Sequence, residues 1–284
     1  MLLAPCYGWG QHSKLDSLSF WNINIPHRPI TSRTGSEFVK IIQNMDIEQR
    51  ELAIYDEIIR GNIPDFMRVA VRVNSLEKLA NKDYEITLFV LPDYFSIGSN
   101  DDFVLMPMTP ILAQQVMNHI GGTLPTRKMV DIIWSAAKIK LAPIPIPPSD
   151  SMATVVVFDR HNQLLKDQRV VLGWHFLNGT LVGGHKKDVI ISNSLATHEK
   201  KVVIYGWHYQ SGVAIQPMYK GHAIWYADYS HGIRGIASKC LVNGQSIDVH
   251  DILQDPILYK LLSDENQPMT ITKYDTSTSR YPRK

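Results

Sequence analysis

Cysteine, net charge and long apolar runs are all scarce in this sequence. Its 284 residues include two cysteines, Cys6 and Cys240, for which one disulfide and two free thiols are equally allowed. The formal net charge is only +2, too weak to predict binding to nucleic acid or to an anionic membrane. The longest apolar runs, such as residues 86–91 and 202–205, fall far short of the roughly 20 residues that a membrane-spanning helix needs. We therefore expect no nucleic-acid partner and no membrane span.

Targeting signals are missing too. Met1 is followed by neither a charged segment nor a full apolar core, so no signal peptide is predicted at the start of the chain. A charged content of 20%, with many Asn, Ser, Thr, Trp and Tyr residues, nevertheless favours an extracytoplasmic setting. A hydrophobic content of 44% is typical of a soluble globular protein. Cofactor and oligomeric state have no signal in the sequence.

The first half of the chain predicts helices with short strands between them. Residues 1–33 show no clean period and predict an irregular arm, pinned to the body by three aromatic residues: Trp9, Phe20 and Trp21. Helical spacing and capping residues predict four helices: 35–45, the segment after Asp46, 110–120 after Thr109, and one that begins near Thr123 or Thr126. Alternating apolar residues predict three strands: 66–73, 84–91 and 95–98.

A proline-rich connector, residues 142–148, leads into the second half. Asp150 or Ser151 is expected to cap a helix that runs to about Arg169, although residues 154–158 also fit a strand. Strands are predicted next: 182, 189–192, 202–207, 213–216, 223–228 and 233–237. Hairpin turns are predicted at residues 210–212 and 243–244, a helical segment over 249–262, and a flexible tail over 264–284.

Together these elements predict a single α+β domain over residues 1–284. Helices of the first 170 residues would pack on a largely antiparallel sheet that comes mainly from the C-terminal half. The connector is only seven residues long, so we interpret it as a strap within one fold and not as a linker between domains.

Polar chemistry is concentrated between Gly183 and Gly235. Six of the eleven histidines lie between His175 and His231, among aromatic residues and glycines that separate apolar runs. Functional side chains gather where loops leave rigid elements. The candidate catalytic residues are His208, His222, Asp228, Ser230 and His231, and the candidate substrate-binding residues are Lys187, Trp207, Trp225, Tyr226 and Arg234.

Several roles are open to these residues. A serine mechanism would need His208 or His222 as the base for Ser230, because Ser230 and His231 point apart on extended backbone. Alternatively, His231 is a general acid or base, and Asp228 or Tyr229 holds its tautomer. The flat rings of Trp207, Trp225 and Tyr226 would suit a sugar, and Arg234 could hold a carboxylate. A zinc or iron site of His208, His222, His231 and an acid is the third option, but the usual short histidine spacing is missing, so no metal ligand is predicted. For each histidine taken singly, a packing role is the alternative.

The segment from Gly184 to Asp188 carries a second cluster, His185, Lys186, Lys187 and Asp188. Strand alternation places His185 and Lys187 on one face and Lys186 and Asp188 on the other. His185 and Asp188 therefore cannot chelate one ion on a regular strand, and surface charges at a strand end are the alternative to a functional role.

Four segments together resemble an uncharacterised bacterial protein family of unknown function: residues 124–131, 184–188, 205–208 and 228–234. The resemblance would cover most of the chain from about Ile54 to Ser263, and it implies a shared fold and a shared site. Residues 230–234 also resemble the Ser-His-Gly-Cys-Ile-Arg box of L,D-transpeptidases. Here the nucleophilic cysteine is absent, because Ile233 directly follows Gly232.

The function expected from these patterns is a hydrolase-like enzyme with a His/Asp/Ser site, acting on a glycan or another cell-wall substrate. A non-catalytic ligand- or glycan-binding protein and a purely structural protein are the alternatives. The shared-site hypothesis predicts that the rings of His208 and His231 lie within about 10 Å, the reach of one bridging water. Neither Cys6 nor Cys240 is expected to be catalytic, because no helix start that would lower a thiol pKa follows either one.

Overall fold

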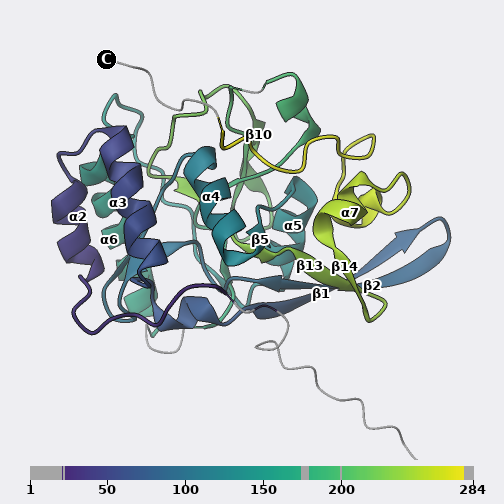
Figure 1. The fold of residues 1–284 in the computed structure, drawn as a ribbon, viewed down its shortest axis with the longest axis horizontal. Coiled ribbons are helices and arrows are strands. Elements are labelled where there is room, and N and C mark those ends of the chain that lie inside the picture. The colour runs from purple at the N-terminus through teal and green to yellow at the C-terminus, as the bar shows by residue number, and fades with distance from the viewer. Residues whose placement is uncertain (1–20, 22, 174–178, 199, 278–284) are drawn as a thin grey trace, which may run out of the picture.

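The structure of the chain is a computed structural model that describes residue 21 and residues 23–173, 179–198 and 200–277. It confirms the α+β class, with most helices in the first 171 residues. Figure 1 shows three helices together at one end of the molecule, while the β1–β2 hairpin projects at the other: α2 (Gly35–Ile42), α3 (Ile47–Ile59), α6 (Val155–Val171), β1 (Val71–Leu79) and β2 (Lys82–Val90). No helix in these described ranges is long and apolar enough to cross a membrane.

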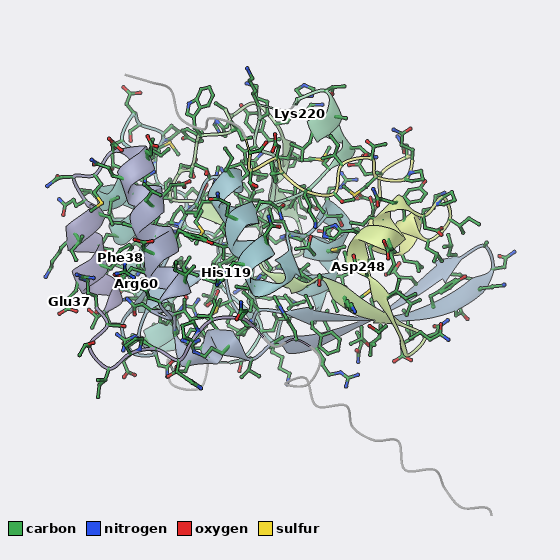
Figure 2. All side chains as sticks on the ribbon, viewed as in Figure 1. Glu37, Phe38, Arg60, His119, Lys220 and Asp248 are labelled. Atoms are coloured by element: carbon green, nitrogen blue, oxygen red, sulfur yellow. The ribbon has the colours of Figure 1, made fainter. Side chains whose placement is uncertain are left out.

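The N-terminal helices begin at the predicted caps. The Thr34 side chain accepts a hydrogen bond from the backbone of Glu37, and Glu37 accepts one from the backbone of Thr34. Asp46 and Gln49 form the same reciprocal capping box at α3. On α2, Phe38 is buried with 1% of its surface exposed, and its neighbour Glu37 lies at the outer edge in Figure 2.

Two further helices also match the sequence. Thr109 caps α4 (Pro110–Ile120), and Thr126 caps α5 (Arg127–Ala136). Gly121 ends α4 with φ of 68°, a left-handed conformation that glycine adopts without steric cost.

The larger sheet has six strands in the described part of the chain. Its order is β14-β13-β2-β12-β5, with β1 on the remaining side of β2, and every pairing is antiparallel. The strands not yet defined are β5 (Gly122–Thr123), β12 (Ile236–Ala237), β13 (Lys239–Val242) and β14 (Gln245–Asp248). This sheet joins the two halves of the chain, and the predicted turn at residues 243–244 forms its β13–β14 hairpin.

A smaller sheet of four strands carries most of the candidate site. Its order is β10-β9-β8-β11, with bounds β8 (Lys187–Val189), β9 (Ile204–His208), β10 (Ala214–Tyr219) and β11 (His231–Gly232). The hairpin predicted at residues 210–212 joins β9 to β10. β8 and β11 pair in parallel, so this sheet is mixed. Two short pairs complete the strands: β3 (Ser96–Gly98) with β4 (Phe103–Leu105), and β6 (Ile139–Lys140) with β7 (Val182–Gly183).

The connector at residues 142–148 contains no regular element, and it lies against the site region. The backbone N–H of Ile146 donates to the hydroxyl of Tyr229 over 2.7 Å, and that hydroxyl donates to the Ile146 carbonyl over 3.2 Å. α6 begins after Thr154, later than predicted. Residues 155–158 are helical, so the strand alternative does not hold.

Two predicted strands are wrong. Residues 66–73 divide into a 3-10 helix η1 (Asp65–Arg68) and the start of β1, because Pro64 turns the chain and accepts a bond from Met67. Residues 223–228 form no strand beyond an isolated bridge of Ala223 with Lys201. There the backbone of Tyr226 bonds back to Ala223, so a local turn uses groups that a strand ladder would need.

The C-terminal part is more packed than the sequence indicates. Beyond α7 (Val249–Gln254) and α8 (Tyr259–Leu262), residues 264–277 lie on the body, whereas the sequence predicts a flexible tail. Met269 and Tyr274 are buried, and Arg127 binds Asp264 over 2.5 Å. At the other end, Trp21 donates to the carbonyl of Ile120 over 2.9 Å, as the predicted arm requires. Trp9, Phe20 and Cys6 lie outside the described residues.

Candidate functional site

The structure divides the predicted site residues between two faces of the smaller sheet. Lys187 pairs with His231 on the neighbouring strand, whereas the next residue, Asp188, pairs with Tyr205. Because successive strand residues point to opposite faces, two separate groups result. The His231 group comprises Lys187, Trp207, His222, Tyr226, Asp228, Ser230 and His231. The His208 group comprises Asp131, Trp134, Asp188, Tyr205 and His208.

A break in strand alternation on β9 sets this division. Gly206 and Trp207 both have positive φ, 107° and 58°, so the strand reverses its faces there. Tyr205 and His208 consequently reach the same carboxylate, that of Asp131, although they are three residues apart. Trp207 turns to the other face, where its ring lies 5.0 Å from the ammonium nitrogen of Lys187. A positive φ at a tryptophan is a strained conformation of the kind that clusters at functional sites.

His231 is the most unusual residue of the His231 group. Its side chain is buried, and its ring contacts the rings of Tyr226 and His222 at centroid distances of 5.9 and 6.3 Å. Neither ring nitrogen has a hydrogen-bond partner among the described residues. Burial lowers the pKa of His231 to about 4, against the opposing attraction of Asp228, so the ring is neutral at pH 7. Because an unpaired buried polar group costs stability, such a group calls for a functional reason.

Asp228 is held firmly beside this histidine. One carboxylate oxygen accepts from the backbone and the hydroxyl of Ser230 at 2.8 and 2.5 Å, and the other accepts from Tyr226 at 3.3 Å. Burial alone would raise the pKa of Asp228, but its attraction to His231, which is protonated only at low pH, and the Ser230 hydrogen bonds hold it below its usual value. The Ser230 hydroxyl therefore donates to a carboxylate and not to an imidazole. The serine–histidine pair that the sequence allowed is not assembled.

The rim of the His231 group is more open. His222 stacks on Tyr226 at 4.2 Å between ring centroids, and the edge of Tyr219 meets His222 at 5.0 Å. Burial is the main cause that lowers the pKa of His222, and also that of Lys187. Trp225 remains 38% exposed. Part of the aromatic surface is therefore exposed at this rim.

Two residues adjoining this group, Lys186 and His161, were missed as site residues, and Tyr229 was considered only as a residue that could hold the tautomer of His231. Lys186 is buried, and its ammonium group donates to the carbonyl of Tyr229 and lies 3.2 Å from Nδ1 of His161. Burial lowers the pKa of Lys186 to about 7 and that of His161 to about 2. The rings of His161 and Tyr229 are 4.8 Å apart. In the sequence Lys186 is noticeable only as a charged residue next to an apolar run. Its contact with His161 on α6 could not be predicted, because no local sequence pattern relates the two residues.

Arg234, expected to hold a substrate carboxylate, is instead a structural residue. Its guanidinium donates to the carbonyls of Leu91 and Val182 at 3.0 and 2.6 Å and lies 4.1 Å from the ring centroid of Tyr94. The side chain is 1% exposed, on the face opposite His231. These contacts leave only Nε without a partner among the described residues.

A buried ion cluster ties three elements together behind the site. Asp93, just after β2, binds Arg169 of α6 over 2.5 Å and His185 over 3.2 Å. Burial would raise the pKa of Asp93, but the Arg169 charge holds it well below its usual value. Burial lowers the pKa of His185 to about 4. All three side chains are buried, so we assign them to positioning the segment that leads into β8.

Three residues of the His208 group, Trp134, Asp188 and His208, line a small cavity. His208 binds Asp131 over 3.1 Å and stacks on Trp134 at 5.3 Å between centroids. Burial raises the pKa of Asp188 to about 6, and Tyr94 donates to its carboxyl group over 2.8 Å. The cavity has a volume of about 10 Å³, room for roughly one water molecule.

His208 and His231 do not share contacts. Within the described ranges, no residue that bonds or stacks with His208 is in ring contact with His231. The two histidines therefore belong to separate groups, on opposite faces of the sheet. Sequence reasoning could not foresee this, because it depends on the reversal at Gly206 and Trp207.

Metal and thiol chemistry have little support in the part of the chain that the structure describes. No group of three or more His, Cys, Asp or Glu side chains there could hold a metal ion. Cys240 is a buried free thiol, and burial raises its pKa to about 12. A reactive thiolate is therefore not expected at Cys240, and labelling of the native chain by a thiol reagent would contradict this.

No protein-family model, no curated protein and no solved structure matches this chain. The resemblances to a bacterial family and to the L,D-transpeptidase box therefore stay predictions. The functional proposal therefore depends on the geometry of the His231 group.

Proposed function

We propose that the chain is a hydrolase-like enzyme in which His231 transfers a proton and Asp228 stabilises its charged form. The observation that carries this proposal is the buried imidazole of His231, with both ring nitrogens free of partners in the described residues. A structural histidine in a core normally uses at least one ring nitrogen in a hydrogen bond. A general base must instead keep one nitrogen available for the substrate or for water.

The electrostatics support a base that is neutral at rest. Burial lowers the pKa of His231 to about 4, so the imidazole can accept a proton at pH 7. The nearby Asp228 carboxylate opposes this shift, and it would stabilise the imidazolium that forms. In the proposed step a water proton passes to His231 and the water oxygen forms a bond to the attacked carbon of the substrate. The bond between that carbon and the leaving group then breaks, and the leaving group takes its electron pair and receives the proton from His231.

Ser230 has a supporting role in this mechanism. Its hydroxyl donates to Asp228 over 2.5 Å, which fixes the carboxylate beside His231. The substrate class expected from the sequence, a glycan or another cell-wall component, fits the exposed Trp225 and the half-buried Tyr226 at the rim, because flat aromatic faces bind sugars well.

A non-catalytic binding protein is the second candidate. It is favoured by the low exposure of the central residues, since His231 and Asp228 are 1% and 2% exposed. In this alternative the same aromatic rim binds a ligand and no proton is transferred.

The test uses purified chain and a panel of chromogenic esters, amides and glycosides together with peptidoglycan fragments. His231→Phe should lower turnover of any cleaved substrate by roughly 10²–10⁴-fold, the usual contribution of a positioned proton-transfer group. His250→Phe is the matched control, because His250 on α7 also has a buried ring nitrogen without a partner. Full activity of the His231→Phe variant would contradict the proposal. Saturable binding without cleavage of any substrate would favour the binding protein.

A further inference from the structure

Two buried ring nitrogens near Tyr229 have no hydrogen-bond partner among the described residues. They are Nε1 of Trp207 and Nε2 of His161. Both rings contact Tyr229, at centroid distances of 6.3 and 4.8 Å. Trp207 is 4% exposed and His161 is fully buried, so neither donor is simply turned towards bulk water. Two unpaired donors around one aromatic ring indicate a place where an acceptor binds.

The protonation of His161 follows from its neighbour. A protonated Lys186 has only donors, so Nδ1 of His161, 3.2 Å from the ammonium nitrogen, must accept. The pKa of His161 is low because of burial, and the neutral ring then carries its single proton on Nε2. Nε2 is thus an N–H donor: the backbone of Ile144 acts on this ring and opposes the lowering of its pKa, but no bond of full hydrogen-bond geometry reaches Nε2 from the described residues.

The charges around these donors also favour an anionic ligand. Lys186 and Lys187 approach Tyr229 and Trp207, and the nearest carboxylate, Asp228, already accepts three hydrogen bonds. Asp93 also acts on Lys186 but is bound by Arg169 and His185. The group therefore offers donors and positive charge in excess of acceptors. A neutral sugar would need acceptors as well, and a cation would be repelled.

We infer that this site binds an oxyanion, a carboxylate or phosphate group of its substrate, through Nε1 of Trp207, Nε2 of His161 and the ammonium groups of Lys186 and Lys187. The inference rests on the proposed function, since it names the substrate class of the same site. His231 would then act on a bond next to the anchored anion.

The experiment measures binding of inorganic phosphate and of acetate to the full chain by thermal shift and tryptophan fluorescence. Chloride at equal ionic strength is the control for screening. Saturable stabilisation by phosphate identifies a phosphate-type group, and by acetate a carboxylate. Stabilisation by neither probe, or equally by chloride, overturns the inference.

Two variants locate the binding. Trp207→Phe removes one donor and keeps an aromatic ring, so affinity should fall on the order of tenfold, the loss expected from one charge-assisted hydrogen bond. Trp134→Phe is the matched control, because Trp134 also has an unpaired buried Nε1, on the opposite face of the sheet. Lys187→Gln, at a half-buried position, gives a second test if Trp207→Phe does not fold. Unchanged affinity in the folded Trp207→Phe and Lys187→Gln variants contradicts the assignment.

The pH dependence supplies an independent readout. Lys186 faces His161 from α6, Asp93 from the end of β2, and Tyr229 and Asp228 from the segment before β11. Because burial lowers the pKa of Lys186 to about 7, its charge disappears as pH rises through 7. Acetate keeps the same charge over this range, because its pKa lies well below 6. Acetate binding should therefore weaken from pH 6 to pH 8, and stronger acetate binding at pH 8 would contradict the inference. His231→Phe should lower turnover by roughly 10²–10⁴-fold yet retain anion binding, which separates failure of this inference from failure of the catalytic proposal.

Discussion

At the scale of single residues, His231 combines a buried ring with two ring nitrogens that have no hydrogen-bond partner among the described residues. Substitutions of this ring should therefore affect stability and activity to different extents. His231→Phe replaces the unpaired imidazole by an apolar ring, which should leave the free energy of unfolding unchanged or raise it by about 1 kcal/mol. His231→Ala should instead lower it by roughly 2–4 kcal/mol, because it leaves a cavity. Chemical denaturation measures both. A loss above about 2 kcal/mol in His231→Phe would show that the ring nitrogens make hydrogen bonds that matter for folding.

Asp188 predicts a pH dependence with a definite sign. Its folded pKa, about 6, lies above its usual value of 3.8, so its stabilising contribution is fully present only below that usual value and is lost as pH rises through 6. The Asp188→Asn variant does not titrate here and lacks this loss. Relative to wild type, the variant should gain about 2 kcal/mol of unfolding free energy between pH 4 and pH 7, as measured by denaturation at each pH.

Asp228→Asn is the opposite-sign control for this measurement. The folded pKa of Asp228 is lowered, so its contribution is present at neutral pH and is lost as pH falls. The unfolding free energy of Asp228→Asn should therefore fall relative to wild type as pH rises. A pH-independent difference for Asp188→Asn would mean that Asp188 titrates normally in the folded chain.

At the scale of elements, the reversal in β9 separates the two faces of the smaller sheet. Gly206 has φ of 107°, and a Cβ there would lie 3.4 Å from the Asp188 carboxylate and from the His208 ring. Gly206→Ala should cost about 2–3 kcal/mol of unfolding free energy. Gly121→Ala isolates backbone strain alone, since nothing lies within 4 Å of its Cβ, and should cost about 1 kcal/mol. Equal losses in the two variants would contradict a special role for the β9 reversal.

At the scale of the whole molecule, the C-terminal segment closes over the smaller sheet. The Tyr274 hydroxyl accepts from the backbone of Val203 over 3.0 Å and donates to the carbonyl of Ile190 over 2.7 Å. Tyr274→Phe should lower the unfolding free energy by about 1–3 kcal/mol, because two buried backbone groups lose their partner. Tyr209→Phe, at a tyrosine that is 52% exposed, should change it by less than about 0.5 kcal/mol. A silent Tyr274→Phe would support the flexible tail that the sequence predicts.

Local features of the structure could be predicted from the sequence alone. The helix starts at Thr34, Asp46, Thr109 and Thr126 depend on side chains that bond within their own first turn. The hairpin turns at residues 210–212 and 243–244 depend equally on nearby glycines. The clustering of His222, Tyr226, Asp228, Ser230 and His231 was also foreseen, because these residues are close in the chain.

Only the tertiary structure decided which polar groups are buried together. Lys186 meets His161 from 25 residues away and Tyr229 from 43 residues away, and no local spacing encodes such contacts. The same holds for Arg234, which looked free to bind a substrate until Leu91 and Val182 supplied its acceptors. The separation of His208 from His231 arises from strand pairing and two positive φ angles. The sequence by itself determined which residues are capable of chemistry here. Long-range packing decided which of their polar groups become buried without a hydrogen-bond partner, because burial depends on segments that are far apart in the chain.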